Sequence, residues 1–175
     1  MKLKSMLLLS SIFMSASVVA ADWTPVFKNF ENGCADSKLL QHIVNKSIWT
    51  EHGTTPDAFV RKSALKGNYA NVMLPYKNDM LAAKSKLYND GEQYIEVTIP
   101  LKNATLYGLP LKGFTVYSGT ASGLAGRTLV FGQLNATQLQ KLKSIKFKAD
   151  AEQEFKAVIS TDKQKQTILA CDVSM

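Results

Sequence analysis

Two hydrophobic patterns follow one another along the chain, and the first has the period of an α-helix. In the segment that ends near Ile48, apolar residues recur at helical spacing, and Asp36 or Ser37 can cap its start. Thr55-Pro56-Asp57 then supplies a capping hydroxyl, a proline at the first helical position and an acid in the first turn. We therefore expect a helix up to about Ile48 and a second, short helix that ends near Gly67-Asn68.

From Tyr69 onward the pattern changes to a period of two, which is typical of strands. Residues 69–74 alternate in this way, and residues 95–101 alternate with one dry face and one wet face. Between these runs, Asn89-Asp90-Gly91 is a strong hairpin turn. Residues 80–88 fit either a helix or the partner strand of that hairpin, and the Asp-Gly turn favours the strand.

Further strand-like runs follow, separated by glycine and proline. Leu106–Leu111 is interpreted as a buried bend between two strands, with an exposed patch for a partner as the alternative. Asn135 can cap a helix over residues 136–143. The remaining strand candidates are Gly113–Ser118, Arg127–Phe131, Ile145 with Phe147, Phe155–Ser160 and Thr167–Val173. Two early helices and a mostly antiparallel sheet with one inserted helix predict a single α+β domain.

The N-terminus has the three-part pattern of a bacterial secretory leader. The lysines of MKLKS precede a short apolar run, and small residues place the cleavage after Ala20 or Ala21. The run is shorter than the roughly 20 residues that span a bilayer, and no second segment is apolar enough to do so. We expect residues 1–21 to be a cleaved leader and residues 22–175 to be one domain, located in the periplasm or secreted.

The two cysteines, Cys34 and Cys171, lie near the two ends of the expected mature chain. In an oxidising compartment a single pair is expected to form a disulfide. Two buried thiols or a redox pair are the alternatives, but a redox pair usually has Cys-x-x-Cys spacing. Because Leu169, Cys171 and Val173 share one strand face, the disulfide should point inward and tie the N-terminal helix region to the last strand.

The charge of the chain permits an anionic partner. The formal net charge of +7 falls to +5 when Lys2 and Lys4 leave with the leader. This balance allows attraction to anionic surfaces, although it is also an ordinary route to solubility. No pattern of aromatic and basic residues accompanies it, so nucleic acid is not expected. His42 and His52 match no zinc spacing, and no metal or other cofactor is expected.

A glycine-rich loop is the first candidate for a binding contact. It contains Gly119, Ser122, Gly123 and Gly126 and ends at Arg127. The backbone amides of such a turn can form a concave anion nest, to which an arginine adds a two-pronged donor. The loop lacks the Gly-Lys-Ser/Thr ending of a phosphate-binding P-loop, so a flexible connection between two strands is the favoured alternative.

A basic run is the second candidate. Lys141, Lys143, Lys146 and Lys148 occur without an intervening acid, while the apolar residues between them have core positions. This pattern is consistent with an electrostatic platform for a cell-envelope polymer or an acidic protein. The alternative is a solvated face on which lysines protect a sheet edge from aggregation.

The function that these observations favour is that of a non-enzymatic binding or interaction protein, including an inhibitor or immunity protein that acts on an envelope enzyme or toxin. A small hydrolase is the first alternative, with Glu51, His52 and Asp57 as its least implausible catalytic group. A carrier of an apolar ligand is the second. A carrier would have a deep apolar cavity, whereas an interaction protein would have a filled core and an exposed patch.

Overall fold

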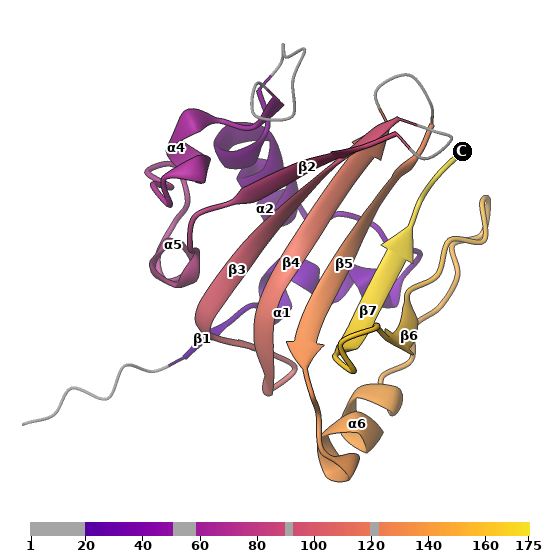
Figure 1. Cartoon of the computed structure of the whole chain (residues 1–175). Helices are drawn as coiled ribbons and strands as arrows, with labels where there is room; N and C mark the ends of the chain where they lie inside the picture. The colour runs from indigo at the N-terminus through magenta and orange to yellow at the C-terminus, as the bar shows by residue number, and fades with distance from the viewer. Residues whose placement is uncertain (1–19, 51–58, 90–92, 120–122) are drawn as a thin grey trace, which may run out of the picture.

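The structure, a computed structural model, describes residues 20–50, 59–89, 93–119 and 123–175. Within these residues, seven strands form one sheet in the order β1-β3-β4-β5-β7-β6, with β2 also paired to β3 (Figure 1). All pairings are antiparallel except that of β1 with β3. The strands are β1 (Ala21–Asp22), β2 (Lys84–Tyr88), β3 (Tyr94–Leu106), β4 (Leu109–Gly119), β5 (Ala125–Gly132), β6 (Val158–Thr161) and β7 (Thr167–Asp172). The α+β prediction is confirmed.

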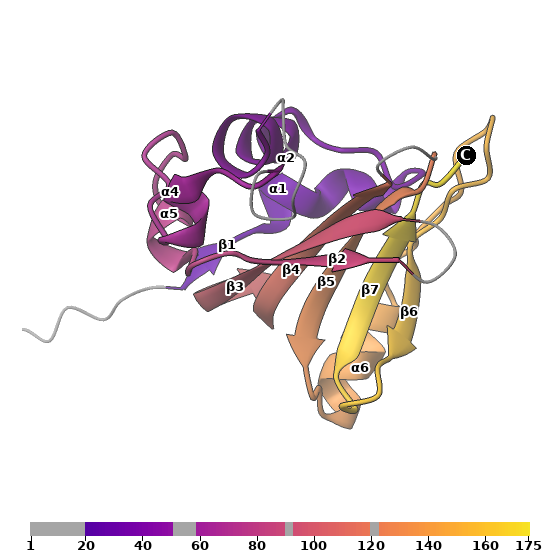
Figure 2. The same ribbon diagram turned by 45° about the horizontal axis from the view of Figure 1, so that its top comes forward.

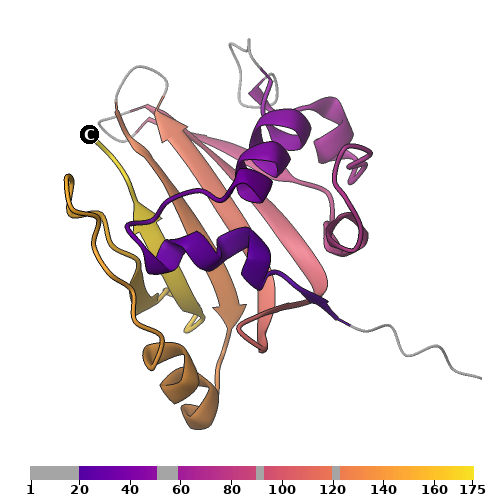
Figure 3. The same cartoon turned by 180° about the vertical axis from the view of Figure 1, so that it is seen from behind.

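The early helices cover one face of this sheet (Figures 2 and 3). In Figure 3, α1 crosses the strands and α2 lies beside it. The opposite face of the sheet, toward the viewer in Figure 1, has no helix of the described residues against it. The helical elements are α1 (Thr24–Phe27), the 3-10 helix η1 (Lys28–Glu31), α2 (Lys38–Ile43), the π-helical turn η2 (Val44–Ile48), α4 (Lys62–Leu65), α5 (Tyr76–Asp79) and α6 (Ala136–Lys143).

An aromatic cluster joins the covering layer to the sheet. Trp23, Phe27 and Phe30 come from the N-terminal segment, and all three are fully buried. The ring of Phe114 in β4 lies 5.8 Å from that of Trp23 and 5.4 Å from that of Phe27, measured between centroids. Each such ring removes about 150–250 Å² from water, so this cluster dominates the contact between the two layers.

The first expected helix is confirmed, including its cap. The Ser37 hydroxyl accepts a hydrogen bond from the backbone N–H of Leu40, with an N–O distance of 3.0 Å. The second expected helix differs from the prediction. Residues 55–58 lie outside the described residues, Val60 forms an isolated β-bridge with Trp49, and α4 is a single turn that stops before Gly67. Gly67 has φ +69°, a conformation that suits a helix end.

The strand expected at residues 69–74 is wrong, since this segment forms turns that lead into α5. The neighbouring outer edge of β3 is already occupied along its length. β2 pairs with one part of that edge, Met80 bridges to Leu101, and β1 pairs with Ala104 and Thr105. Alternation over six residues therefore does not yield a strand here.

The hairpin partners are as expected, with two differences in detail. Residues 84–88 form a strand, which pairs with β3, while residues 90–92 of the connecting turn lie outside the described residues.

Leu106–Leu111 is buried at its leucines but forms a tight hairpin rather than a break in the ladder. Tyr107 and Gly108 both have positive φ, as a two-residue turn requires, and Pro110 pairs with Thr105.

The inserted helix α6 is confirmed, with a reciprocal capping box between Asn135 and Gln138. Residues 145–157, expected in part as strands, lie outside the sheet instead, and β6 begins at Val158. The backbone of Lys148 bonds to the covering layer, to Glu31 and Gly33. A little further on, the Asp150 carboxylate accepts backbone N–H groups of residues 152–155, which closes a turn. The Lys148 bonds hold this segment against the covering layer, and the Asp150 bonds turn the chain back toward β6.

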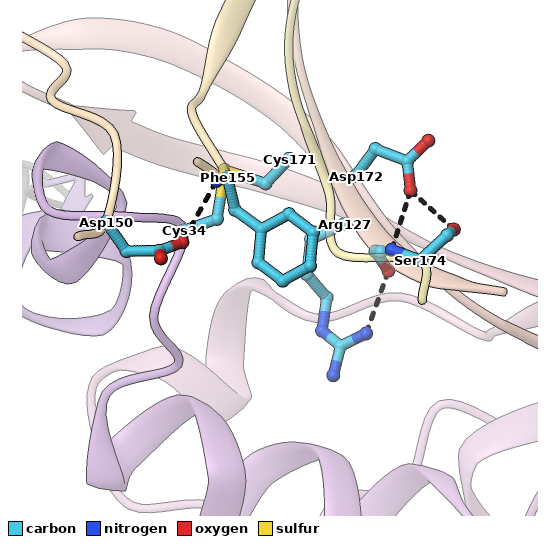
Figure 4. The surroundings of a disulfide bond; sticks show 8 residues. Cys34, Arg127, Asp150, Phe155, Cys171, Asp172 and Ser174 are labelled. Atoms are coloured by element: carbon cyan, nitrogen blue, oxygen red, sulfur yellow. Dashed lines mark hydrogen bonds between the residues drawn. A yellow bond between two sulfur atoms is a disulfide. The ribbon is translucent and has the colours of Figure 1, made fainter. Parts of the chain in front are cut away.

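The disulfide between Cys34 and Cys171 is present, with a Cα–Cα distance of 5.5 Å. Both residues are buried, and Cys171 faces the covering layer from β7. The bond therefore ties the segment after η1 to the second strand from the sheet edge, as the sequence predicts. Figure 4 shows Phe155 beside the disulfide, with the backbone N–H of Phe155 bonded to the Asp150 carboxylate.

Removal of the disulfide should destabilise the protein by the same amount from either end. Cys34→Ser and Cys171→Ser each open the same 137-residue loop, so each should lower the free energy of unfolding by about 2–5 kcal/mol. Urea denaturation checks this. The double variant should be no less stable than the single variants. Additive or strongly unequal losses would show that the two cysteines act as separate core residues.

Candidate functional site

The basic run begins on α6, which its capping box holds in place at one end of the sheet. Leu142 is fully buried, while Lys141 and Lys143 are exposed on either side of it. After the helix the same alternation continues through residues 145–148, where the apolar residues are half-buried and the lysines are exposed. The outward position of the lysines is therefore as the sequence predicts.

Part of this run lines a groove of about 520 Å³ between the segment after α6 and strand β6. Three lysines and five apolar residues line it, and no acid does so among the described residues. The lysines are Lys143, Lys146 and Lys156, and the apolar residues are Ile145, Phe147, Ala157, Val158 and Ile159. The groove thus combines positive charge with an apolar floor, and we take it as the candidate binding site.

The groove lies along a sheet edge. Within the described residues, β6 pairs with β7 on one side and with no strand on the other. Val158 at the start of β6 is 56% exposed, which is unusual for a valine in a sheet. An edge strand presents unpaired backbone N–H and C=O groups, so it can accept a further strand from another chain.

Lys156 is the groove residue that sequence reasoning missed. It lies ten positions after Lys146 and outside the basic run, so charge clustering along the chain does not find it. Its alternation with Phe155 and Ala157 resembles that of the other lysines, and this was the available signal. The fold brings it to the groove because the chain turns back at Asp150 before it enters β6.

The other two lysines of the run do not line the groove. The ammonium group of Lys141 lies over Gly108, at the β3–β4 turn, so close that a Cβ added there would touch it. Lys148 is exposed, but its backbone is paired with the covering layer beside Asn32. The four lysines that the sequence groups together therefore divide into two that line the groove and two that do not.

The glycine-rich loop lies at the opposite end of the sheet from α6 (Figure 1). Gly119 ends β4, Gly123 precedes β5, and Ser122 lies outside the described residues. Packing accounts for two of its glycines. A Cβ on Gly126 would collide with the ring of Tyr117, its cross-strand partner, and a Cβ on Gly123 would collide with the backbone of Met175.

Arg127 is engaged within the fold. Its Nη2 lies 3.0 Å from Oδ2 of Asp36, and its Nη1 donates to the carbonyl oxygen of Gly126 at 2.8 Å. The two side chains of the ion pair are only about a fifth exposed, at 18% and 20%. Asp36 directly precedes the cap of α2, so the ion pair links that helix to β5. A guanidinium that already holds a carboxylate is a poorer ligand for an added anion.

The catalytic group of the hydrolase alternative, Glu51, His52 and Asp57, lies outside the described residues. His42 is exposed, and its Nε2 lies 3.0 Å from the carbonyl oxygen of Asn71. In the described part of the chain, no group of three or more His, Cys, Asp or Glu side chains is placed to hold a metal ion.

A smaller hollow of about 240 Å³ bears on the carrier alternative. Trp49, Phe59 and Ile95 line it together with Thr50, Ser118 and Gly119. Ligand sites usually enclose about 300–1,000 Å³, and this hollow is below that range. The leucines and aromatic rings behind it fill the core.

Comparison with known proteins adds no relative: no protein-family model, no curated protein and no solved structure matches this chain. Among the helices of the described residues, none has the length and apolar character needed to cross a membrane.

The role of Arg127 in the fold can be tested by a double-mutant cycle. Asp36→Asn and Arg127→Met should each lower the free energy of unfolding by about 1 kcal/mol, because each removes the same partly buried ion pair. The double variant should lose clearly less than the sum. Asp36→Asn combined with Arg61→Met, which removes an arginine elsewhere, should be additive. Additive losses for Asp36 and Arg127 would show that their contact does not contribute to stability.

Proposed function

We propose that this chain is an exported, non-enzymatic binding protein that holds an acidic, extended segment of another protein in the lysine-lined groove. The N-terminal charge and apolar pattern and the disulfide support export to an oxidising compartment. The observation that carries the binding proposal is the groove itself, where Lys143, Lys146 and Lys156 surround an apolar floor beside an unpaired strand edge.

A polypeptide fits this surface better than a charged polymer does. A polyanion such as a cell-envelope polymer would use the lysines but would leave the apolar floor and the backbone edge unused. An extended peptide uses all three features, because its backbone pairs with β6 while alternate side chains point into the groove. Acidic and apolar residues in alternation would complement the lysines and the floor. An inhibitor or immunity protein that captures a segment of its target would act in this way.

A second copy of the same chain is a poor occupant. Two copies that met edge to edge at β6 would bring the groove lysines of both copies together, with no acid among the described lining residues to offset them. Like charges placed opposite each other across a strand pair are destabilising. The net charge of about +5 for the chain without its leader adds to this repulsion.

The proposal predicts that an alternating Glu–Val decapeptide binds at low salt and shifts the NMR signals of the β6 amides. Lys146→Glu with Lys156→Glu should weaken this binding by about tenfold or more, since two attractive charges become repulsive. Val158→Asn should weaken it as well. Raising the salt to about 0.5 M should weaken binding to the unmodified protein, because exposed charges are then screened.

Three controls make the test specific. Lys66→Glu with Lys77→Glu makes the same change in net charge at exposed lysines away from the groove, and it should leave binding nearly unchanged. An alternating Lys–Val decapeptide should not bind. Polyphosphate that bound as tightly as the Glu–Val peptide would favour a charged polymer over a protein segment. Peptide binding that did not respond to the Lys146 and Lys156 changes would contradict the proposed site.

A further inference from the structure

A buried carboxylate lies close to the expected end of the leader. Asp79, at the end of α5, is 5% exposed. Its Oδ2 accepts a hydrogen bond from the indole Nε1 of Trp23 at 3.2 Å, and the carboxylate also accepts the backbone N–H of Ala21. Burial raises the pKa of this carboxyl above its usual range, and the two hydrogen bonds act in the opposite direction.

Within the part of the chain that the structure describes, this carboxylate has no cation in contact. No lysine or arginine of the described residues lies within 4.0 Å of it, and Lys102, an exposed residue of β3, acts on it only from farther away. A buried charge without a counter-ion is costly, and proteins usually pair such a group or neutralise it. A positive charge beside Asp79 would therefore stabilise the fold, and the described residues do not place one there.

Ala21 is held in place beside this carboxylate. It begins β1, which pairs with Ala104 and Thr105 of β3, and it is 5% exposed. The following residues fix it further, because the backbone N–H of Trp23 donates to the carbonyl oxygen of Thr105 at 2.7 Å and the Trp23 ring is fully buried. The β1–β3 pairing and the buried Trp23 ring thus fix the position of the Ala21 backbone, whose N–H is a donor to the Asp79 carboxylate.

We propose that the leader is cut between Ala20 and Ala21, and that the new α-ammonium group of Ala21 forms a buried ion pair with Asp79. This inference rests on the export proposed above. In the cut, a peptidase of the secretory pathway adds water across the peptide bond. The hydroxyl goes to the carbonyl carbon of Ala20, and the nitrogen of Ala21 gains the proton and then takes a second one from solvent. The neutral N–H donor of Ala21 thereby becomes a cation beside the Asp79 carboxylate.

Geometry distinguishes the two cleavage sites that the sequence leaves open. Cleavage after Ala21 would remove the amide that bonds to Asp79 and would begin the chain one residue further on, about 3.3 Å along the strand. Asp22 would then place its own carboxylate next to the new terminus. Cleavage after Ala20 keeps the nitrogen of Ala21 as a donor to Asp79 and gives it a positive charge. Because Ala21 is buried in the folded protein, the cut must precede folding, and its product is the form that the fold accommodates best.

A double-mutant cycle tests the ion pair directly. Four chains are prepared in vitro with the disulfide formed: one that starts at Ala21, one with Gly-Ser added before Ala21, and the Asp79→Asn variant of each. With Asp79 present, the extension should lower the folding equilibrium constant by at least about tenfold, because it replaces a cation by a neutral amide. In the Asp79→Asn background the extension should have little effect. An equal effect in both backgrounds would overturn the ion pair.

A second measurement needs no substitution. In the chain that starts at Ala21, NMR titration should give the α-amino group a pKa above its ordinary range, because the nearby Asp79 carboxylate favours the charged amine by more than burial disfavours it. A raised pKa contributes stability that is complete below pH 8 and is lost as the pH rises through the raised value. Among the other charged or titratable groups nearby, Lys102 acts on Asp79 from a distance, and burial and the charge of Asp22 raise the pKa of Tyr76, which lies on the same helix as Asp79, above its usual range. An ordinary α-amino pKa would overturn the inference.

The mass of the protein recovered from a bacterial periplasm separates this inference from the proposal of export. A chain that starts at Ala21 supports both. A chain that starts at Asp22 supports export and overturns the inferred cleavage site. Protein that stays in the cytoplasm at full length contradicts export, while the cycle with purified chains still reports on the ion pair. If the recovered chain has the expected mass but the extension has the same effect with and without Asp79, the ion pair is overturned and the proposal of export is not.

Discussion

The rest of the structure depends on how the single covered face of the sheet is closed. A sheet with one dry face needs a second layer, and here the segment from Trp23 to Ile48 provides much of it through its aromatic and aliphatic side chains. The two layers are joined at Phe114 of β4, because the rings of Trp23 and Phe27 both contact its ring. The disulfide, the Arg127–Asp36 ion pair and the β1–β3 pairing then hold this layer at three separate places along the sheet.

The proposed partner segment would meet the protein at the β6 edge. Within the described residues β2 and β6 each pair with one strand only, and β6 is the one of the two that borders the lysine-lined groove. Lysines beside such an edge discourage pairing between identical chains. In the proposed function the same lysines would select a partner that carries acids. Protection of an edge and recognition of an acidic segment are thus compatible roles for one set of residues.

Local signals predicted local structure well, and the misses come from distant contacts. Ser37 and Asn135 cap their helices because a cap needs only the next three residues. The strand expected at residues 69–74 did not form, and other segments occupy the neighbouring edge of β3, which no local pattern reports. The partners Arg127 and Asp36 are 91 residues apart, and Trp23 and Asp79 are 56 apart. Sequence reasoning placed Arg127 in a binding loop because its carboxylate partner is invisible until the chain is folded.

The central claim is that the N-terminal layer and the sheet form one cooperative unit, and native-state hydrogen exchange tests it most directly. Slow amides in α2 and in the β4–β5 strand pair should exchange through the same global opening, with the same free energy and the same dependence on denaturant. This coincidence is expected because the N-terminal layer provides much of the cover for the apolar face of the sheet. Amides of α2 that exchange through a separate opening, several kcal/mol below that of β4, would show that the sheet persists without its N-terminal layer and would contradict the account.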